Sequence, residues 1–297
     1  MQGHTRRERV EQVAHLIVVG SGKGGVGKST VSVNLAVALA RRGCQVGLLD
    51  ADDYGPSVPM MLGARKRGES QGWQATLPLA RRGKVAPEQM LQPLVRYGVK
   101  VMSAGFFIGE EQPVAPMPDV QGIFIRQLLH GVNWGRLDYL LIDLPPGNGE
   151  PQATLCRELE LDGAILVTTP QDIARIDTAK GVSLFQQVGV PILGLVQNMA
   201  GFICPHCGER VDIFPPSSEA SSLLHDILLL GVIPLDLATA RSGDSGRPIV
   251  VTMPESLVSS EFYAIAGRVK ESIETRHVAD QSDGEDEAGG EAPSDIQ

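Results

Sequence analysis

The chain has 297 residues, a net charge of −9 and 42% hydrophobic residues, of which few are aromatic. Four cysteines are too few for a disulfide scaffold, no apolar stretch is long enough to span a bilayer, and the acidic balance argues against a nucleic-acid surface. The first fifteen residues lack the apolar segment of a secretory signal. We therefore expect a cytoplasmic protein with an aliphatic core and with no nucleic-acid or membrane partner.

Short apolar runs alternate with helical patterns along the chain. A strand over 15–19, a helix over 30–42 and a strand over 46–50 form a βαβ unit, which predicts parallel strands. The later predicted strands are 99–104, 139–143, 164–168, 192–197 and 230–233, and the later predicted helices are 120–131, 151–158, 172–188, 217–228 and 255–275. This alternation predicts an α/β fold: a doubly wound, mainly parallel sheet with helices on both faces.

Three stretches depart from this pattern. Residues 1–14 are polar, so we expect a flexible N-terminal segment before one domain over 15–276. Residues 65–96 are rich in Arg and Lys, and a solvated surface excursion with or without a hairpin is favoured over a partner-binding segment. Residues 277–297 hold seven acidic residues and no Lys or Arg, which predicts a disordered acidic tail.

A glycine-rich loop lies between the first predicted strand and the first predicted helix. Residues 20–30 read GSGKGGVGKST and fit the phosphate-binding pattern G-x-x-x-x-G-K-[ST], in which glycines let backbone N–H groups converge on phosphate oxygens. We expect Lys28 to reach the β- and γ-phosphates of ATP and Ser29 to bind Mg²⁺. A glycine turn that binds nothing is much less favoured in this context. The predicted nucleotide-binding residues are Gly22, Lys23, Gly24, Gly25, Val26, Gly27, Lys28, Ser29 and Thr30.

A second lysine, Lys23, stands at the start of this loop. It is poorly placed to fold back onto the nucleotide of its own chain, and the alternative is an ordinary solvated lysine. The whole phrase KGGVGK favours a role across a two-fold axis, where Lys23 would neutralise charge on the phosphates of a neighbouring chain.

Carboxylates follow two of the predicted strands. Asp50 and Asp52 end or follow the second strand, and Asp143 ends the strand over 139–143. Carboxyl ends of parallel strands face the ligand crevice, so we expect Asp143 and Asp50 to hold Mg²⁺ with Ser29, and Asp52 to orient the attacking water. Each alone could be a turn aspartate, but three such residues around a phosphate loop favour function.

The segment 199–215 carries the pattern C-P-H-C, with Cys204 and Cys207 three positions apart. A closed zinc or iron–sulfur site needs about four ligands, and Cys44 and Cys156 form no second C-x-x-C. His206 is an alternative ligand, although a role in orienting the loop is favoured. From spacing alone, a zinc site and an iron–sulfur site are equally supported, and a redox-active thiol pair is a third alternative.

Further motifs extend the pattern. They are LLDADDYGPSVPMML, VKVMSAGF, DYLLIDLPPGNGE, DGAILVTTPQDIARIDTAKG, VPILGLVQNMAGFICPHCG and IPLD. With SGKGGVGKST they resemble the Mrp/ApbC family of deviant-Walker P-loop ATPases, relatives of MinD and of the nitrogenase iron protein, over about residues 16–276. The resemblance implies a P-loop NTPase fold of the SIMIBI type.

The resemblance also implies a function. Members of this family form homodimers that bind and slowly hydrolyse ATP and pass iron–sulfur clusters to apoproteins. It implies that a 4Fe–4S cluster lies between two subunits, held by Cys204 and Cys207 of each, and that Lys23 is the signature lysine. It further implies that Asn198, Pro234 and Asp236 contact adenine. The expected cofactors are ATP, Mg²⁺ and the cluster, and the expected partners are a second copy, cluster donors and apo client proteins.

Three segments differ from the family pattern. Residues 112–122 lack the arginine and Gly-Pro pair common at this point, residues 215–222 read PPSSEASS where a glycine-rich run is common, and PPGNG at 145–149 replaces PPGTG. We expect altered contacts in the first segment, a stiffer flank of the metal loop, and slightly different chemistry after Asp143.

A MinD/ParA-like positioning ATPase and a zinc-stabilised nucleotide switch are the alternative functions.

Overall fold

The structure is a computed structural model that describes residues 7–52, 55–64, 90–107, 125–204, 206–207, 209–214 and 224–288. Its centre is an eight-stranded sheet of order β10-β7-β6-β1-β5-β2-β4-β3, in which only the β3–β4 pair is antiparallel. The strands are β1 (Val13–Ser21), β2 (Val46–Asp50), β3 (Leu94–Arg96), β4 (Val99–Ser103), β5 (Leu137–Asp143), β6 (Gly163–Thr168), β7 (Ile192–Gln197) and β10 (Leu229–Val232).

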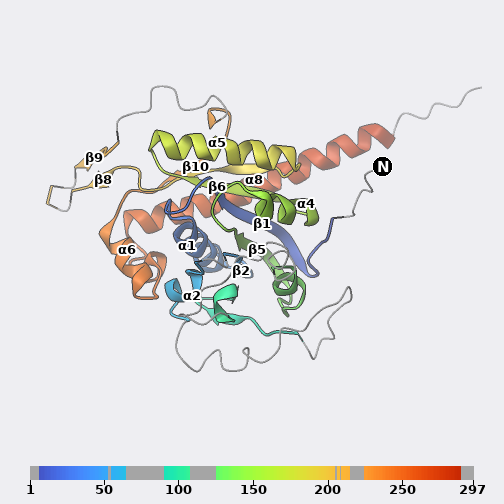
Figure 1. Cartoon of the computed structure of the whole chain (residues 1–297), viewed down its shortest axis with the longest axis horizontal. Coiled ribbons are helices and arrows are strands. Elements are labelled where there is room, and N and C mark those ends of the chain that lie inside the picture. The colour runs from blue at the N-terminus through green and yellow to red at the C-terminus, as the bar shows by residue number, and fades with distance from the viewer. Residues whose placement is uncertain are drawn as a thin grey trace, which may run out of the picture.

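Helices cover both faces of this sheet (Figure 1). α1 (Lys28–Arg41), α7 (Ile249–Thr252) and α8 (Leu257–Ala288) pack against one another, and α4 (Glu150–Glu158) packs against α5 (Asp172–Gln187). The central strands are buried along their length, which explains their continuous aliphatic sequences. Two further helices, α2 (Val58–Met61) and α6 (Leu237–Asp244), lie near α1. The predicted doubly wound α/β fold is confirmed.

The topology places a crevice at the end of β1. From β1 the chain passes through α1 to β2 on one side of the sheet, and it later returns to β6 and β7 on the other side. Ligands of open α/β sheets bind where the strand order reverses, outside the carboxyl ends of the strands. The loop between β1 and α1 therefore occupies the position where such a fold binds its ligand.

The predicted strands are all present, and their ends lie within two residues of the prediction. The helices predicted over 30–42, 151–158 and 172–188 agree equally well. Of the predicted helix 120–131, residues 125–130 are helical and the rest lies outside the described residues. Of the predicted helix 217–228, only 224–228 is described, and it forms turns.

The N-terminal prediction is corrected by the structure. Within 1–14, residues 7–14 are held against the domain rather than flexible, and β1 begins at Val13. The Arg7 guanidinium donates to the Val188 carbonyl oxygen, and the Glu8 N–H donates to the Glu158 carbonyl oxygen at 2.7 Å. Val10 is buried in the core. The polar composition of the segment concealed these contacts because they join it to backbone carbonyl groups that are far away in the sequence, with Val10 as the apolar contribution.

The C-terminal helix also differs from its prediction. α8 continues to Ala288, whereas the sequence predicted a helix only to 275 and a disordered tail over 277–297. A helix that is already nucleated and anchored by a buried face gains one hydrogen bond for each added residue, so weak formers can extend it. Residues 289–297 lie outside the described residues.

The basic segment 65–96 is described only from residue 90 onward. There β3 pairs with β4 through Tyr97 and Gly98, both of which have positive φ, as a two-residue hairpin turn requires. The hairpin is therefore present at the end of the segment, and residues 65–89 lie outside the described part. In the described ranges, no helix is both long and apolar enough to cross a bilayer.

Candidate nucleotide and thiol site

The loop between β1 and α1 is closely packed at its glycines. A Cβ on Gly22 would lie 2.3 Å from the backbone of Asp177, and a Cβ on Gly27 would lie 2.2 Å from Nδ2 of Asn198. Gly25 and Gly27 also have φ near +83°, a region that favours glycine. The loop leads directly into α1 at Lys28, so its backbone N–H groups and the positive end of a long helix meet at one place. This arrangement is suited to bind phosphate.

The lysine, serine and aspartate predicted for phosphate and magnesium come together. Nζ of Lys28 lies 2.9 Å from Oδ1 of Asp143, and the Ser29 hydroxyl donates to Oδ2 of Asp143 at 2.5 Å. Asp143 is fully buried and Lys28 is nearly so. An oxygen-only set of one hydroxyl and one carboxylate beside a phosphate loop fits Mg²⁺, which prefers such ligands and shares its coordination with substrate phosphates.

A further serine, Ser32, holds the same aspartate and was missed in the sequence. Its hydroxyl lies 2.7 Å from Oδ1 of Asp143 and 3.1 Å from the Lys28 carbonyl oxygen, and the residue is fully buried. Ser32 lies one helical turn after Lys28, so that spacing could have indicated that it shares the face turned toward Asp143. Ser32 restrains one carboxylate oxygen and leaves the other beside Ser29.

We expect Ser32→Ala to weaken the Mg²⁺-dependent part of nucleotide binding by roughly tenfold, because residues that orient a metal ligand typically contribute that much to metal affinity. ADP affinity without Mg²⁺ should change little. Calorimetric titration of ADP with and without Mg²⁺ measures both. Ser183→Ala is the matched control, because Ser183 makes the same hydroxyl-to-carbonyl contact within α5 but lies away from Asp143.

Asp50 lies beside Asp143 in the sheet, because β2 and β5 pair with these two residues in register. It is fully buried and accepts hydrogen bonds from the Ser103 hydroxyl at 2.9 Å and from the Asp52 N–H at 3.2 Å. Burial, and then the negative charge of Asp143, raise the pKa of Asp50 to about 8. A buried carboxyl group with a raised pKa favours the binding of a cation nearby, because the cation lowers the free-energy cost of ionising the group. Ser103 was not predicted from the sequence.

The raised pKa of Asp50 gives a pH prediction. The folded protein keeps a proton on Asp50 up to about pH 8, whereas the unfolded chain releases it near its ordinary pKa of 3.8, so this group's contribution to stability falls as the pH rises between these values. Asp50→Asn removes that dependence. In metal-free buffer, we expect the variant to melt at a higher temperature than the wild type at pH 8.5, with the difference shrinking toward pH 5. A difference that grew toward acid pH would show that Asp50 is ionised throughout.

Asp52 is buried and makes local contacts. Its carboxylate accepts the N–H of Gly55 at 3.2 Å, and its own N–H donates to Asp50. This is the turn geometry that an aspartate commonly adopts after a strand. The role of Asp52 in orienting water stays a prediction. Asp53 lies outside the described residues.

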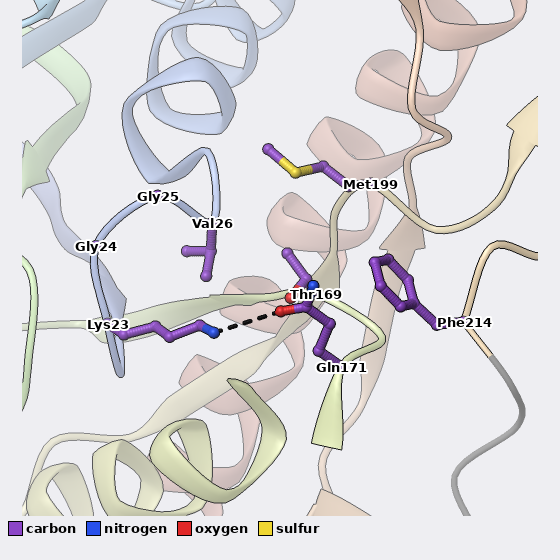
Figure 2. Close-up of a pocket in the computed structure, with 8 residues that line it drawn as sticks. All are labelled: Lys23, Gly24, Gly25, Val26, Thr169, Gln171, Met199 and Phe214. Atoms are coloured by element: carbon purple, nitrogen blue, oxygen red, sulfur yellow. Dashed lines mark hydrogen bonds between the residues drawn. The ribbon is translucent and has the colours of Figure 1, made fainter. Parts of the chain in front are cut away.

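Lys23 lines a pocket of about 130 Å³ at the mouth of the phosphate loop (Figure 2). Its Nζ lies 3.5 Å from Oε1 of Gln171 in the same chain, at the start of α5. Thr169 also lines the pocket, and its buried hydroxyl has no hydrogen-bond partner among the described residues. The other lining residues are Gly24, Gly25, Val26, Met199 and Phe214. Lys23 thus lies at the mouth of the phosphate loop, and its role toward a second chain stays a prediction.

The three residues predicted to contact adenine follow β7 and β10. Asn198 is buried, and its Nδ2 donates to the Val26 carbonyl oxygen at 2.9 Å. Pro234 is buried just after β10, and Asp236 caps α6 by accepting the N–H and the hydroxyl of Thr239, each at 2.7 Å. Among the described hydrogen bonds of these three residues, that of Asn198 reaches the phosphate loop, and the adenine contacts of all three stay predictions.

Cys204 and Cys207 are carried by a small hairpin. β8 (Phe202–Ile203) pairs with β9 (Arg210–Val211), and the Cys204 N–H donates to the Glu209 carbonyl oxygen at 2.9 Å. We call the described residues 202–204, 206–207 and 209–211 the thiol hairpin; its strands β8 and β9 lie at the left edge of the molecule in Figure 1. Cys204 is half-buried and Cys207 is exposed. The backbone N–H groups of Cys207 and His206 lower the pKa of the Cys204 thiol, which favours the thiolate that binds metals.

The other two cysteines lie outside the thiol hairpin. Burial raises the pKa of Cys156 to about 12, and Cys44 packs against the core beside β2. In the part of the chain that the structure describes, no three His, Cys, Asp or Glu side chains gather as a metal site. One chain therefore presents two thiols where a closed tetrahedral site takes four ligands.

The fold is shared with solved nucleotide-binding proteins. A nucleotide-binding protein from Archaeoglobus fulgidus, solved in complex with ADP, is 37% identical with a TM-score of 0.66, over 84% of this chain and 91% of that chain. The cell division ATPase MinD of Pyrococcus furiosus is 28% identical with a TM-score of 0.64, over 87% and 99% of the two chains.

Curated relatives are more similar in sequence. The iron–sulfur cluster carrier protein of Synechocystis is 44% identical over 89% of this chain and 72% of its own length. The iron–sulfur cluster transfer protein NUBPL of Mus musculus is 40% identical over 90% and 80%. The model of the ParA-type family described as NUBPL iron-transfer P-loop NTPase matches residues 12–270. The chain therefore belongs to the NUBPL family of iron-transfer P-loop NTPases.

Proposed function

We propose that this protein binds ATP with Mg²⁺ and carries a 4Fe–4S cluster between two of its chains, which it transfers to apoproteins while slowly hydrolysing ATP. The observation that carries the proposal is that one chain combines a phosphate loop with a pair of thiols, one half-buried and one exposed, and that among the described residues no three side chains form a closed metal site. The names of the relatives support iron–sulfur transfer as the purpose of this combination.

The thiol count favours a shared cluster. A cubane cluster takes four cysteine ligands, and two copies of Cys204 and Cys207 supply four. An isologous two-fold interface brings the same surface of each copy together, so a projecting hairpin meets its own copy at the axis. His206 lies between the two cysteines and would adjust the hairpin rather than add a ligand. The cluster is cargo here, and its release requires that the thiols stay accessible.

The nucleotide side of the proposal assigns a task to each residue at the end of β1. The backbone N–H groups of the glycine loop and Lys28 bind the phosphates, and Ser29, Asp143 and Asp50 would hold Mg²⁺, which neutralises phosphate charge when bound. Asp52 orients the attacking water, and Asn198, Pro234 and Asp236 surround the adenine. Lys23 turns away from Gln171 to reach the phosphates of the partner copy.

The proposal includes the setting in which the protein works. It acts in the cytoplasm as a homodimer, it receives its cluster from a donor protein, and it meets apo iron–sulfur proteins as clients. It contacts neither nucleic acid nor a membrane in this role.

The similarity to MinD supports a second candidate, a positioning ATPase that acts on a membrane or on DNA. Sedimentation with anionic liposomes and with DNA, in the presence of ATP, separates the two. Binding to either surface would favour the second candidate, and no binding by a cluster-loaded protein would favour the first.

Metal analysis of protein purified without oxygen tests the proposal directly. A cluster carrier is brown and dimeric, and it contains iron and sulfide in equal amounts. A colourless protein that contains zinc would instead be a zinc-stabilised nucleotide switch. Full retention of iron by a monomer would refute the shared cluster.

A further inference from the structure

One end of the thiol hairpin is tied to the phosphate loop by Asn198. Its Nδ2 donates to the Val26 carbonyl oxygen inside the loop, and the lack of a Cβ at Gly27 is what admits this side chain. The short segment from Asn198 to β8 is itself fixed. The Ala200 N–H donates to the Ile233 carbonyl oxygen at 2.9 Å, and the Gly201 carbonyl oxygen accepts the Leu235 N–H at 2.8 Å. Asn198 therefore joins the phosphate loop at Val26 to the segment that enters the hairpin.

The other end of the hairpin returns to the same loop through Phe214. This residue follows β9 by three positions, is half-buried, and lines the pocket formed with Lys23, Gly24 and Gly25. Figure 2 shows its ring on the side of the pocket opposite Lys23, near Met199 and Thr169. The adjacent Ile213 is exposed and does not line the pocket. Phe214 therefore places the chain that leaves the hairpin at the pocket beside the phosphate loop.

Between these two attachments the hairpin is a small, hydrogen-bonded unit. Phe202 pairs with Val211 and Ile203 with Arg210, and the Cys204 N–H donates to the Glu209 carbonyl oxygen. The described contacts therefore connect Cys204 to Val26 on one side and to the pocket around Phe214 on the other.

We infer that Phe214 is a positioning residue that, together with Asn198, couples nucleotide occupancy of the phosphate loop to the exposure of Cys204 and Cys207. Phosphate binding at the loop's N–H groups changes the surroundings of both attachments. Because coupling between two binding sites is reciprocal, a metal centre on the thiols then changes nucleotide affinity by the same factor. The inference rests on the nucleotide-binding half of the proposed function and not on the cluster.

Thiol alkylation tests this coupling without any metal. The full chain, reduced and metal-free, is treated with iodoacetamide with and without saturating MgADP, and the rate at each cysteine is read by peptide mass spectrometry. We expect MgADP to change the rate at Cys204 by about fivefold, at the lower end of usual coupling between sites. The rate at Cys156, which is buried, serves as an internal reference for global unfolding.

Substitutions at two adjacent positions separate the role of Phe214 from that of its neighbour Ile213. At MgADP concentrations that saturate each variant, Phe214→Ala should reduce the effect on Cys204 to less than about twofold, whereas Ile213→Ala should keep the wild-type effect. Phe214→Leu, which retains apolar bulk, should restore most of the response. A full response in Phe214→Ala, an equal loss in Ile213→Ala, or no response in a wild-type protein that binds MgADP would overturn the inference.

Failure of the inference and failure of the proposed function give different results. A wild-type protein that shows the MgADP-dependent alkylation but takes up no iron and sulfide retains the coupling and loses the cluster-carrier function. A protein that loads a cluster but shows the same alkylation rates with and without MgADP keeps the function and loses the coupling. Absence of MgADP binding would overturn both.

Discussion

Replacement of Cys204 by serine is expected to leave the anaerobically reconstituted protein monomeric and nearly free of iron, whereas the wild type becomes a brown dimer. Each chain would then offer one thiolate, so two copies supply two of the four ligands that a cubane cluster takes. The substitution changes a half-buried surface position, so folding should be retained. Iron and sulfide content, visible absorption and mass in solution measure the outcome on one sample.

Cys44→Ser is the matched control for this experiment. Cys44 is also a half-buried free cysteine, but it lies beside β2 and away from the hairpin. We expect this variant to load iron and to dimerise like the wild type. Cys207→Ser should reproduce the loss seen with Cys204→Ser. Normal loading in either hairpin variant would show that the ligands lie elsewhere.

Replacement of Lys28 by alanine is expected to lower nucleotide affinity by about a hundredfold or more, since a charge-assisted contact to phosphate in a water-poor site is worth several kcal/mol. It should also lower the free energy of unfolding by roughly 3 kcal/mol, because it leaves the buried carboxylate of Asp143 without its cation. Titration with ADP and denaturant unfolding measure the two effects. The remaining hydroxyl contacts from Ser29 and Ser32 should keep the variant folded.

Lys180→Ala is the control for Lys28→Ala, because Lys180 forms a comparable ion pair with Asp177 on the exposed face of α5. Exposed ion pairs contribute little, so we expect the free energy of unfolding to change by less than about 1 kcal/mol and ADP binding to stay normal.

The Lys28→Ala variant also separates the two halves of the proposed function. It should still accept a cluster, but transfer to an apoprotein should no longer respond to ATP. An unchanged response to ATP would mean that nucleotide does not control transfer.

Patterns formed by residues that are close together in the sequence were enough to predict the fold and the ends of the predicted sheet strands. The alternation of apolar runs and helical spacing placed every predicted strand of the parallel sheet. The glycine loop, Lys28, Ser29 and the C-x-x-C pair were equally visible, because each is a local motif whose chemistry depends on neighbours in the chain. The structure brings Lys28, Ser29 and Asp143 into contact, and their roles at phosphate and magnesium stay predictions.

Other features depend on residues that are far apart in sequence. Ser32 reaches Asp143 across 111 positions and Ser103 reaches Asp50 across 53, while Asn198 reaches Val26 across 172. No local pattern in the sequence identifies the partner in any of these pairs, because each partner is set by the order and register of the strands, such as β2 beside β4 for Asp50 and Ser103. The same is true of the N-terminal segment, whose backbone contacts gave no signal in its polar composition.

The sequence by itself thus determined that this protein has a parallel sheet, a phosphate loop and a pair of thiols in a C-x-x-C pattern, since periodicity and motif spacing are set by neighbouring residues. Only the tertiary structure decided how Asp143 and Asp50 are held, and that the thiol hairpin is attached at both ends to the phosphate loop. The physical reason is that hydrogen bonds and side-chain packing join groups that meet only after the strands have paired.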